Sequence, residues 1–144
     1  MFKEILVPVD LEEESSWRKA LPVAVEMCRK FATKIHLVTV LPTYGMALVG
    51  GYFPKDFETK AFAETTKKLA AFAKEHIPDD VPVDCIVRQG TIYEEIVKAR
   101  AKLGEACDLI VMASHRPQLE DYLLGPNAAR VLRHSKVTVM VVRE

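Results

Sequence analysis

The sequence predicts an α/β protein with a single open, parallel, five-stranded sheet and helices on both of its faces. Short apolar segments alternate with longer segments of helical periodicity, in the order β-α-β-α-β-α-β-α-β. Two of the short segments, 5–9 and 108–112, are almost unbroken apolar runs, which is typical of strands buried on both faces of a parallel sheet. The 144 residues show no internal repeat and no change in composition, so we expect one domain over residues 1–144.

The first strand is expected at Lys3–Val9, and Asp10 follows at its carboxyl end. Asp10 is either a turn or cap residue or, since ligands bind beyond the carboxyl ends of parallel strands, a ligand contact. The acidic, hydroxyl-rich stretch Glu12–Ser16 is typical of a helix start. Pro22 indicates a kink or an early helix start. An apolar stripe at helical spacing is expected to pack in the core: Trp17, Ala20, Leu21, Ala24, Met27, Cys28 and Phe31.

The second strand is expected at Lys34–Leu41, where His36 alternates with apolar neighbours and is predicted to be structural. The next segment, Pro42–Pro54, is long for a connection and unusually apolar. It either covers a ligand, forms a subunit contact or packs on the sheet. Because exposed apolar surface usually marks an interaction, we favour a lid or an interface.

The segment Lys55–His76 predicts a charged helix with four apolar positions, Phe62, Leu69, Phe72 and Ala73. A short third strand is expected at Val83–Arg88. Thr91 and Glu94 have the spacing of a capping box at the start of the third helix, and Gly104 ends that helix. Its buried stripe is predicted to comprise Ile92, Ile96, Ala99 and Leu103.

The last part of the chain predicts an anion site. A fourth strand, Asp108–Met112, runs into a polar turn at 113–117. Gly125 allows a tight turn, and Pro126 suits the first position of a helix because the N–H that it lacks would be unpaired there. A helix N-terminus facing the carboxyl end of a strand presents free N–H groups to an anion, most often a phosphate. The final strand, Lys136–Arg143, would lie at the edge of the sheet, open to pairing with another chain.

Composition excludes several other classes of protein. Twenty basic residues balance twenty acidic ones, which argues against a nucleic-acid partner or an anionic membrane surface. Cys28, Cys85 and Cys107 lie far apart and without metal-ligand spacing, so we expect buried, reduced thiols and neither disulfides nor a zinc site. No apolar run reaches membrane-spanning length, so we expect a cytoplasmic protein without a membrane span.

Two distant segments resemble the universal stress protein family. Residues 5–10 (ILVPVD) resemble the family's opening strand and its Asp, and residues 113–128 (ASHRPQLEDYLLGPNA) resemble a subgroup with an ASHRP-type loop followed by LLG-S-N-A. Nucleotide-binding members carry G-x-x-G, nine residues, then G-[ST]. Here Ala113 and Arg116 replace the two glycines, Gly125 comes one residue early, and Pro126 replaces the hydroxyl residue. Pro126 removes a hydroxyl and an N–H, whereas Arg116 adds a cation with up to five donors.

The resemblance implies a Rossmann-like sheet in the order 3-2-1-4-5, similar to the adenine nucleotide alpha hydrolases, with Asp10 and the Ala113 loop meeting at the switch point. It also implies a site for ATP, ADP or AMP, with or without Mg²⁺ held largely by the phosphates, and a homodimer through Lys136–Arg143 or a tetramer. The implied site residues are Pro8, Val9, Asp10, Thr39, Val40, Met112, Ala113, Ser114, His115, Arg116, Gly125, Pro126, Asn127 and Ala128.

Three functions fit this sequence. An ATP-binding protein with a regulatory stress-response role is favoured by the resemblance. A nucleotide-free interaction module acting through protein partners is permitted by the altered loop. A dedicated enzyme is not expected, because the sequence contains no S-G-G-x-D-S, H-x-G-H, Walker or G-x-S-x-G motif. Ser114 and His115 are neighbours in sequence, but this does not make them a nucleophile and a base aimed at one another. Slow ATP hydrolysis is compatible with the site.

Overall fold

The computed structural model of this chain describes residues 1–42, 55–114 and 126–143, and of residues 55–58 it describes the backbone only. The strands in this part of the chain form one five-stranded sheet in the order β3-β2-β1-β4-β5, with every neighbouring pair parallel. They are β1 (Glu4–Pro8), β2 (Lys34–Leu41), β3 (Val83–Gln89), β4 (Cys107–Ala113) and β5 (Thr138–Val142). The predicted fold class and strand order are confirmed.

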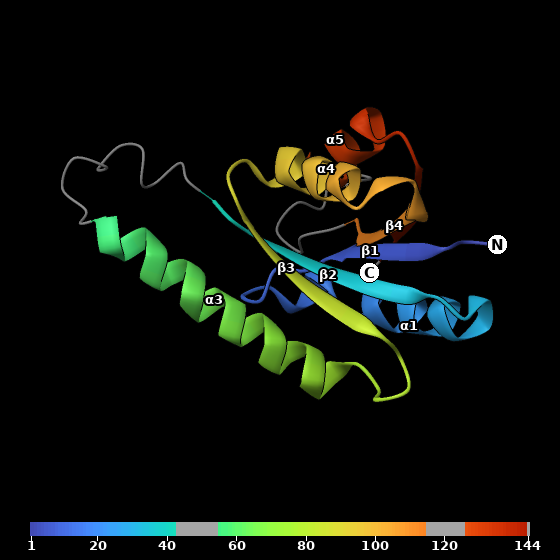
Figure 1. The fold of residues 1–144 in the computed structure, drawn as a ribbon. Coiled ribbons are helices and arrows are strands. Elements are labelled where there is room, and N and C mark those ends of the chain that lie inside the picture. The colour runs from blue at the N-terminus through green and yellow to red at the C-terminus, as the bar shows by residue number, and fades with distance from the viewer. Residues whose placement is uncertain (43–54, 115–125, 144) are drawn as a thin grey trace.

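Helices cover both faces of the sheet (Figure 1). One face carries α1 (Ala20–Phe31) and α3 (Lys55–His76), and the other carries α4 (Ile92–Lys102) and α5 (Pro126–His134). Neighbouring residues of one strand enter different cores: Ile5 packs toward α1 and α3, whereas Leu6 packs toward α4 and α5. Because side chains alternate between two buried faces, both faces of a central strand must be apolar, which explains the unbroken apolar runs.

The first helix begins later than the acidic stretch suggests. Glu14–Ser16 forms a short 3-10 turn, and α1 starts only at Ala20. Pro22 is therefore the third residue of α1, where an N–H has no partner within the helix, so proline breaks no helical hydrogen bond. Trp17 precedes α1 and packs edge-on against Phe72, with ring centroids 5.0 Å apart, in the core role that was predicted for it.

The predicted capping box at the third helix is wrong. Thr91 is the N-cap residue of α4 with an extended backbone, but its side chain makes no capping hydrogen bond. The carboxylate of Glu94 instead accepts a hydrogen bond from the Tyr93 hydroxyl, 3.2 Å away. The prediction for the other end of the helix is right, because Gly104 follows the last turn with φ +78, a conformation that favours glycine.

The predicted apolar stripe of α3 is only partly buried. Leu69, Phe72 and Ala73 are buried, but Phe62 is 39% exposed. The amino-terminal half of α3 extends past the sheet, so no strand lies beneath that part of the helix (Figure 1).

His36 has a structural environment, as predicted. Its side chain is buried, and its Nε2 lies 2.7 Å from Glu4 Oε1 on the neighbouring strand. A salt bridge between Lys34 and Asp84 joins β2 to β3 close by. These polar pairs lie near the amino ends of the strands, whereas Asp10 lies at the carboxyl end of β1.

The cysteines differ in exposure. Cys28 and Cys107 are buried as expected, but Cys85 is exposed, and that part of the prediction is wrong. The reason is its strand: β3 is an edge of the sheet, so it has less cover than the central strands β1 and β4.

This difference predicts that one thiol, Cys85, reacts first with Ellman's reagent in the native protein at pH 8. Burial raises the pKa of the Cys107 thiol to about 11, so roughly one Cys107 in a thousand is ionised at that pH. Burial also raises the pKa of Cys28, and partial burial that of Cys85, but Cys85 alone of the three is exposed. The variant Cys85→Ser should lose the fast phase and Cys107→Ser should keep it. A fast phase that persists in Cys85→Ser contradicts this assignment.

Candidate functional site

The carboxyl ends of β1, β2 and β4 and the beginnings of α4 and α5 surround one open pocket, with an empty volume of about 760 Å³ that includes space open to solvent. It lies where β1 has β2 on one side and β4 on the other, the switch point at which open parallel sheets bind ligands. The described residues that line it are Pro8, Val9, Asp10, Glu13, Ser15, Ser16, Val38, Val40, Ile92, Ile96, Met112, Ala113, Pro126, Asn127 and Ala128.

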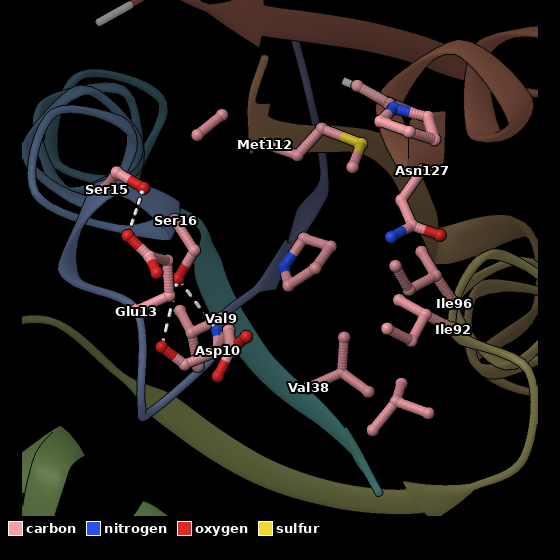
Figure 2. A pocket seen from close by; sticks show the side chains of 15 residues that line it. Val9, Asp10, Glu13, Ser15, Ser16, Val38, Ile92, Ile96, Met112 and Asn127 are labelled. Carbon is pink, nitrogen blue, oxygen red and sulfur yellow. Dashed lines mark hydrogen bonds between the residues drawn. The ribbon is translucent and has the colours of Figure 1, made fainter. Parts of the chain in front are cut away.

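One wall is the polar turn that follows β1 (Figure 2). The Asp10 carboxylate accepts a hydrogen bond from the Glu12 N–H at 3.0 Å. Ser16 Oγ accepts from the Asp10 N–H at 2.8 Å and donates to the Asp10 carbonyl at 3.1 Å. Ser15 Oγ donates to the Glu13 carboxylate at 2.9 Å. These local bonds fold the turn so that two carboxylates, from Asp10 and Glu13, line the pocket.

The floor is the end of β2, which contributes Val38 and Val40 to the lining; Val40 is half-buried, whereas Val38 is fully buried. Val9 N–H donates to the Val38 carbonyl on the β1 side, and Gly90 N–H donates to the Leu41 carbonyl on the β3 side. Because backbone groups alternate along a strand, the N–H and C=O of Val40 point to the β1 side. The described β1–β2 pairing ends before that level, so one donor and one acceptor of Val40 face the pocket.

The opposite wall is apolar, with Ile92 and Ile96 from α4 and Met112 from β4 (Figure 2). Gly90 sets the start of α4: its φ is +145, and a Cβ there would come within 2.9 Å of Glu95 Cγ, so a larger residue does not fit. Gly90 therefore has a conformational role at the turn before α4.

The N-terminus of α5 closes the pocket at the end of β4. Pro126 is its first residue and has no N–H, which leaves the N–H groups of Asn127 and Ala128 in the first turn. The side-chain amide of Asn127 points into the space between the two walls (Figure 2). The positive end of the helix dipole therefore faces the pocket.

Nine of the fourteen predicted site residues line the pocket: Pro8, Val9, Asp10, Val40, Met112, Ala113, Pro126, Asn127 and Ala128. Thr39 and Ser114 do not. Thr39 is buried, and the alternation of β2 directs its side chain to the face opposite Val38 and Val40. Ser114 is 3% exposed, and its N–H donates to the Val142 carbonyl at 3.1 Å, which extends the β4–β5 ladder.

Several predictions lie outside the described residues. They concern His115, Arg116, Gly125 and the proposed lid or interface at Pro42–Pro54.

Six lining residues were missed: Glu13, Ser15, Ser16, Val38, Ile92 and Ile96. Val38 could have been found, because it shares a strand face with Val40 two residues away. The hydroxyls of 15–16 follow Asp10 closely but were attributed to a helix start. Ile92 and Ile96 were assigned to the core, and no sequence signal separates a pocket wall from a core position.

The described residues lack two kinds of feature. They contain no group of three or more His, Cys, Asp or Glu side chains placed to hold a metal ion. Nor does any helix in the described ranges have the length and hydropathy needed to cross a membrane.

Comparison with known proteins gives consistent matches over the full chain. "Universal stress protein G" of Shigella flexneri is 33% identical over 147 residues, covering 99% of this chain and 100% of that protein. The solved structure of hypothetical protein MJ0577 is 28% identical, with a TM-score of 0.76 over 100% of this chain and 97% of its own.

Two more distant solved structures share the fold. A universal stress protein in complex with cAMP is 20% identical with a TM-score of 0.65, covering 99% of this chain and 97% of its own. The universal stress protein of Archaeoglobus fulgidus in complex with dAMP is 18% identical with a TM-score of 0.58, covering 98% and 97%.

The family model described as "Universal stress protein family" matches residues 1–143. This match spans almost the whole sequence, and it agrees with the sheet order and with the relative above 30% identity. The chain therefore belongs to the universal stress protein family.

Proposed function

We propose that this chain is a cytoplasmic, regulatory stress-response protein that binds an adenine nucleotide, ATP, ADP or AMP, in the pocket at the carboxyl ends of β1, β2 and β4. The observation that carries the proposal is an apolar slot with a backbone donor and acceptor at one end and a helix N-terminus at another. Relatives solved with cAMP and dAMP support the choice of an adenine nucleotide.

The slot suits the base. Val40 and Ile92 are half-buried and line the slot, so they offer apolar surface for the faces of a flat ring. The N–H and C=O of Val40 form a donor–acceptor pair, and adenine carries an amino donor next to a ring-nitrogen acceptor. Adenine therefore places its polar edge against the end of β2 and its faces between apolar side chains.

The two other ends of the pocket suit the sugar and the phosphate. Carboxylates accept hydrogen bonds from hydroxyl groups, so Asp10 and Glu13 fit ribose hydroxyls. The N–H groups of Asn127 and Ala128, at the positive end of the α5 dipole, fit a phosphate.

The decisive experiment is native mass spectrometry of the protein as purified, followed by denaturation and identification of any released molecule. We expect an adenine nucleotide at about one per subunit, or uptake of one on addition of millimolar nucleotide. A protein that stays empty in millimolar ATP, ADP and AMP would overturn the proposal, and the nucleotide-free interaction module would become the better hypothesis.

Asp10→Asn is expected to weaken nucleotide binding about tenfold, the effect of losing one charged hydrogen bond of roughly 1.4 kcal/mol. The amide keeps an oxygen that accepts from the Glu12 N–H, so the turn is preserved. Asp108→Asn is the matched control, because Asp108 also accepts a backbone N–H, from Lys3, but at the amino end of β4. Equal affinities for the two variants by isothermal titration calorimetry would limit Asp10 to a turn-forming role.

We propose binding without dedicated catalysis. The Ser114 hydroxyl belongs to a buried residue that does not line the pocket, which disfavours it as a nucleophile. Ser16 Oγ is occupied by both backbone groups of Asp10. ATP turnover above that of the Asp10→Asn variant would overturn this part of the proposal.

We also propose a homodimer through β5, or a tetramer containing it, since β5 is an edge of the sheet. Val142 C=O accepts from Ser114 on β4, so the backbone groups of Val141 point away, along the open edge. Val141→Pro should convert the dimer to a monomer in size-exclusion chromatography with light scattering while leaving the β4–β5 ladder intact. Val87→Pro on the other edge strand, β3, is the control, and a monomeric wild-type protein at micromolar concentration would show the proposal to be wrong.

A further inference from the structure

We propose that the ion pair between Arg88 and Glu95 positions α4 and thereby sets the width of the slot that holds the adenine base. The inference rests on the proposed function, an adenine nucleotide in this pocket, and adds which residues outside the pocket give the base its fit. Neither Arg88 nor Glu95 is among the described lining residues. They are therefore positioning residues, which act on the base through the elements that they join.

Glu95 is the only buried carboxylate among the described residues, with 6% of its surface exposed. Its Oε1 accepts from Arg88 Nε at 3.0 Å and from Arg88 Nη2 at 2.8 Å, and its Oε2 lies 3.3 Å from Lys98 Nζ. A buried ion pair adds little net stability compared with an apolar pair of the same volume, because both charges lose their hydration. It does favour one arrangement of the elements that carry it, since a displaced partner would leave a buried charge unpaired.

The pair joins α4 to the sheet at the level of the base slot. Arg88 lies on β3 directly opposite Val40 in the β2–β3 register, and the backbone N–H and C=O of Val40 face the pocket. Residues three or four apart are neighbours on a helix surface, so Glu95 lies beside Ile92, which lines the pocket together with Ile96. A charge-assisted contact therefore holds the distance between the α4 wall and the end of the sheet.

A second contact of Glu95 fixes the turn between β3 and α4. The Gly90 N–H donates to the Leu41 carbonyl at the end of β2, 2.9 Å away. A Cβ on Gly90 would lie 2.9 Å from Glu95 Cγ and 3.2 Å from Glu95 Oε2, so the glutamate side chain lies against the bare backbone of Gly90. Glu95 thus contacts both β3 and the turn, and Gly90 connects it to the end of β2 that carries Val40.

Glu95→Gln tests this role with almost no change in side-chain size. The amide still fits against Gly90 but carries no charge to pair with Arg88 and Lys98, so α4 loses its fixed distance from β3. We expect the affinity for AMP to fall about tenfold, because a binding site must hold its groups to within about 0.5 Å. Isothermal titration calorimetry measures the loss, and circular dichroism with urea denaturation checks that the variant is folded.

Ribose 5-phosphate separates the positioning of the base slot from a loss of stability. It carries the sugar and the phosphate of AMP but no base, and NMR titration measures its weak binding. Glu95→Gln should change the affinity for ribose 5-phosphate less than about twofold, so the ratio of AMP affinity to ribose 5-phosphate affinity should fall about fivefold or more. A variant that is only less stable would lose both affinities in equal proportion and keep the ratio.

Two further variants complete the test. Arg88→Met removes the partner on β3 and should weaken AMP binding as much as Glu95→Gln does. The double variant should bind AMP no more weakly than either single variant, because the effects of two residues that act as a pair are not additive. The matched control is Asp80→Asn, which should leave AMP affinity unchanged. Asp80 also accepts two hydrogen bonds from one arginine, Arg29, at 3.0 and 2.9 Å, but it lies between α3 and β3, near the amino end of β3.

The outcomes separate the two proposals. Wild-type AMP affinity in a folded Glu95→Gln protein would overturn the positioning role and leave the proposed function standing. Equal losses for AMP and ribose 5-phosphate, additive losses in the double variant, or an equal loss in Asp80→Asn would do the same. Failure of the wild-type protein to bind AMP, ADP or ATP would overturn the proposed function and this inference with it.

Discussion

Phenylalanine in place of Val40 is expected to abolish nucleotide binding, with affinity falling at least about a hundredfold. Val40 is half-buried at the end of β2 and lines the pocket. The larger aromatic ring would occupy the slot assigned to adenine, and a base that cannot enter loses both its apolar contacts and its backbone hydrogen bonds. Isothermal titration calorimetry with AMP and ATP measures the loss.

The control for this variant is Ile86→Phe. Ile86 is half-buried and packs in the same core cluster as Val40, but it lies on the edge strand β3 and does not line the pocket. The two variants should have similar stability in urea, so that only Val40→Phe separates binding from folding. Wild-type affinity in a folded Val40→Phe protein would exclude the slot between β2 and α4 as the base site.

Ile110→Ala is expected to lower the free energy of unfolding by about 3–4 kcal/mol, as for other large-to-small changes in a packed core. Ile110 lies in the middle of β4, is completely buried and packs beneath α4 and α5. Its removal leaves a cavity that the central strand cannot close, because β4 is paired on both sides. Urea denaturation followed by circular dichroism measures the change.

Ile92→Ala is the comparison for the core variant. Ile92 is half-buried and borders the open pocket, so truncation there exposes less new cavity and should cost about 1–2 kcal/mol. It should, however, weaken AMP binding, which Ile110→Ala should not do under conditions where that protein is folded. Equal destabilisation by the two changes would argue that the α4 side of the pocket is as tightly packed as the core.

Much of the fold follows from local sequence patterns. The second strand, Lys34–Leu41, and the helix Lys55–His76 have the bounds that their patterns predict. In both segments the hydrophobic periodicity changes sharply at the ends, and such a change is the strongest local signal for where a strand or helix begins and ends. The start of α1 was misplaced because acidic and hydroxyl residues suit both a helix start and a hydrogen-bonded turn, and residues 10–16 form the turn.

The candidate site was predictable where its residues sit at strand or helix ends. Asp10 and Asn127 were found in this way, because the sheet order inferred for the family places their elements at one switch point. Ser114 was predicted to contact the ligand but does not line the pocket, and only the β4–β5 register shows that its N–H bonds to the Val142 carbonyl. Glu13 was missed because it reaches the pocket only through the hydrogen-bonded conformation of the turn at residues 10–16.

The sequence by itself therefore determined the class of fold, the order of its elements and the end of the sheet at which a ligand would bind. These properties follow from hydrophobic period and from the positions of Gly, Pro and Asp, which act over a few residues. Only the tertiary structure decided which groups remain available in the pocket. The backbone N–H groups of Ser114 and Val9 donate to carbonyls of neighbouring strands, whereas those of Val40 and Asn127 face the pocket. The sequence does not show this difference, because hydrogen bonding between strands depends on register and not on residue type.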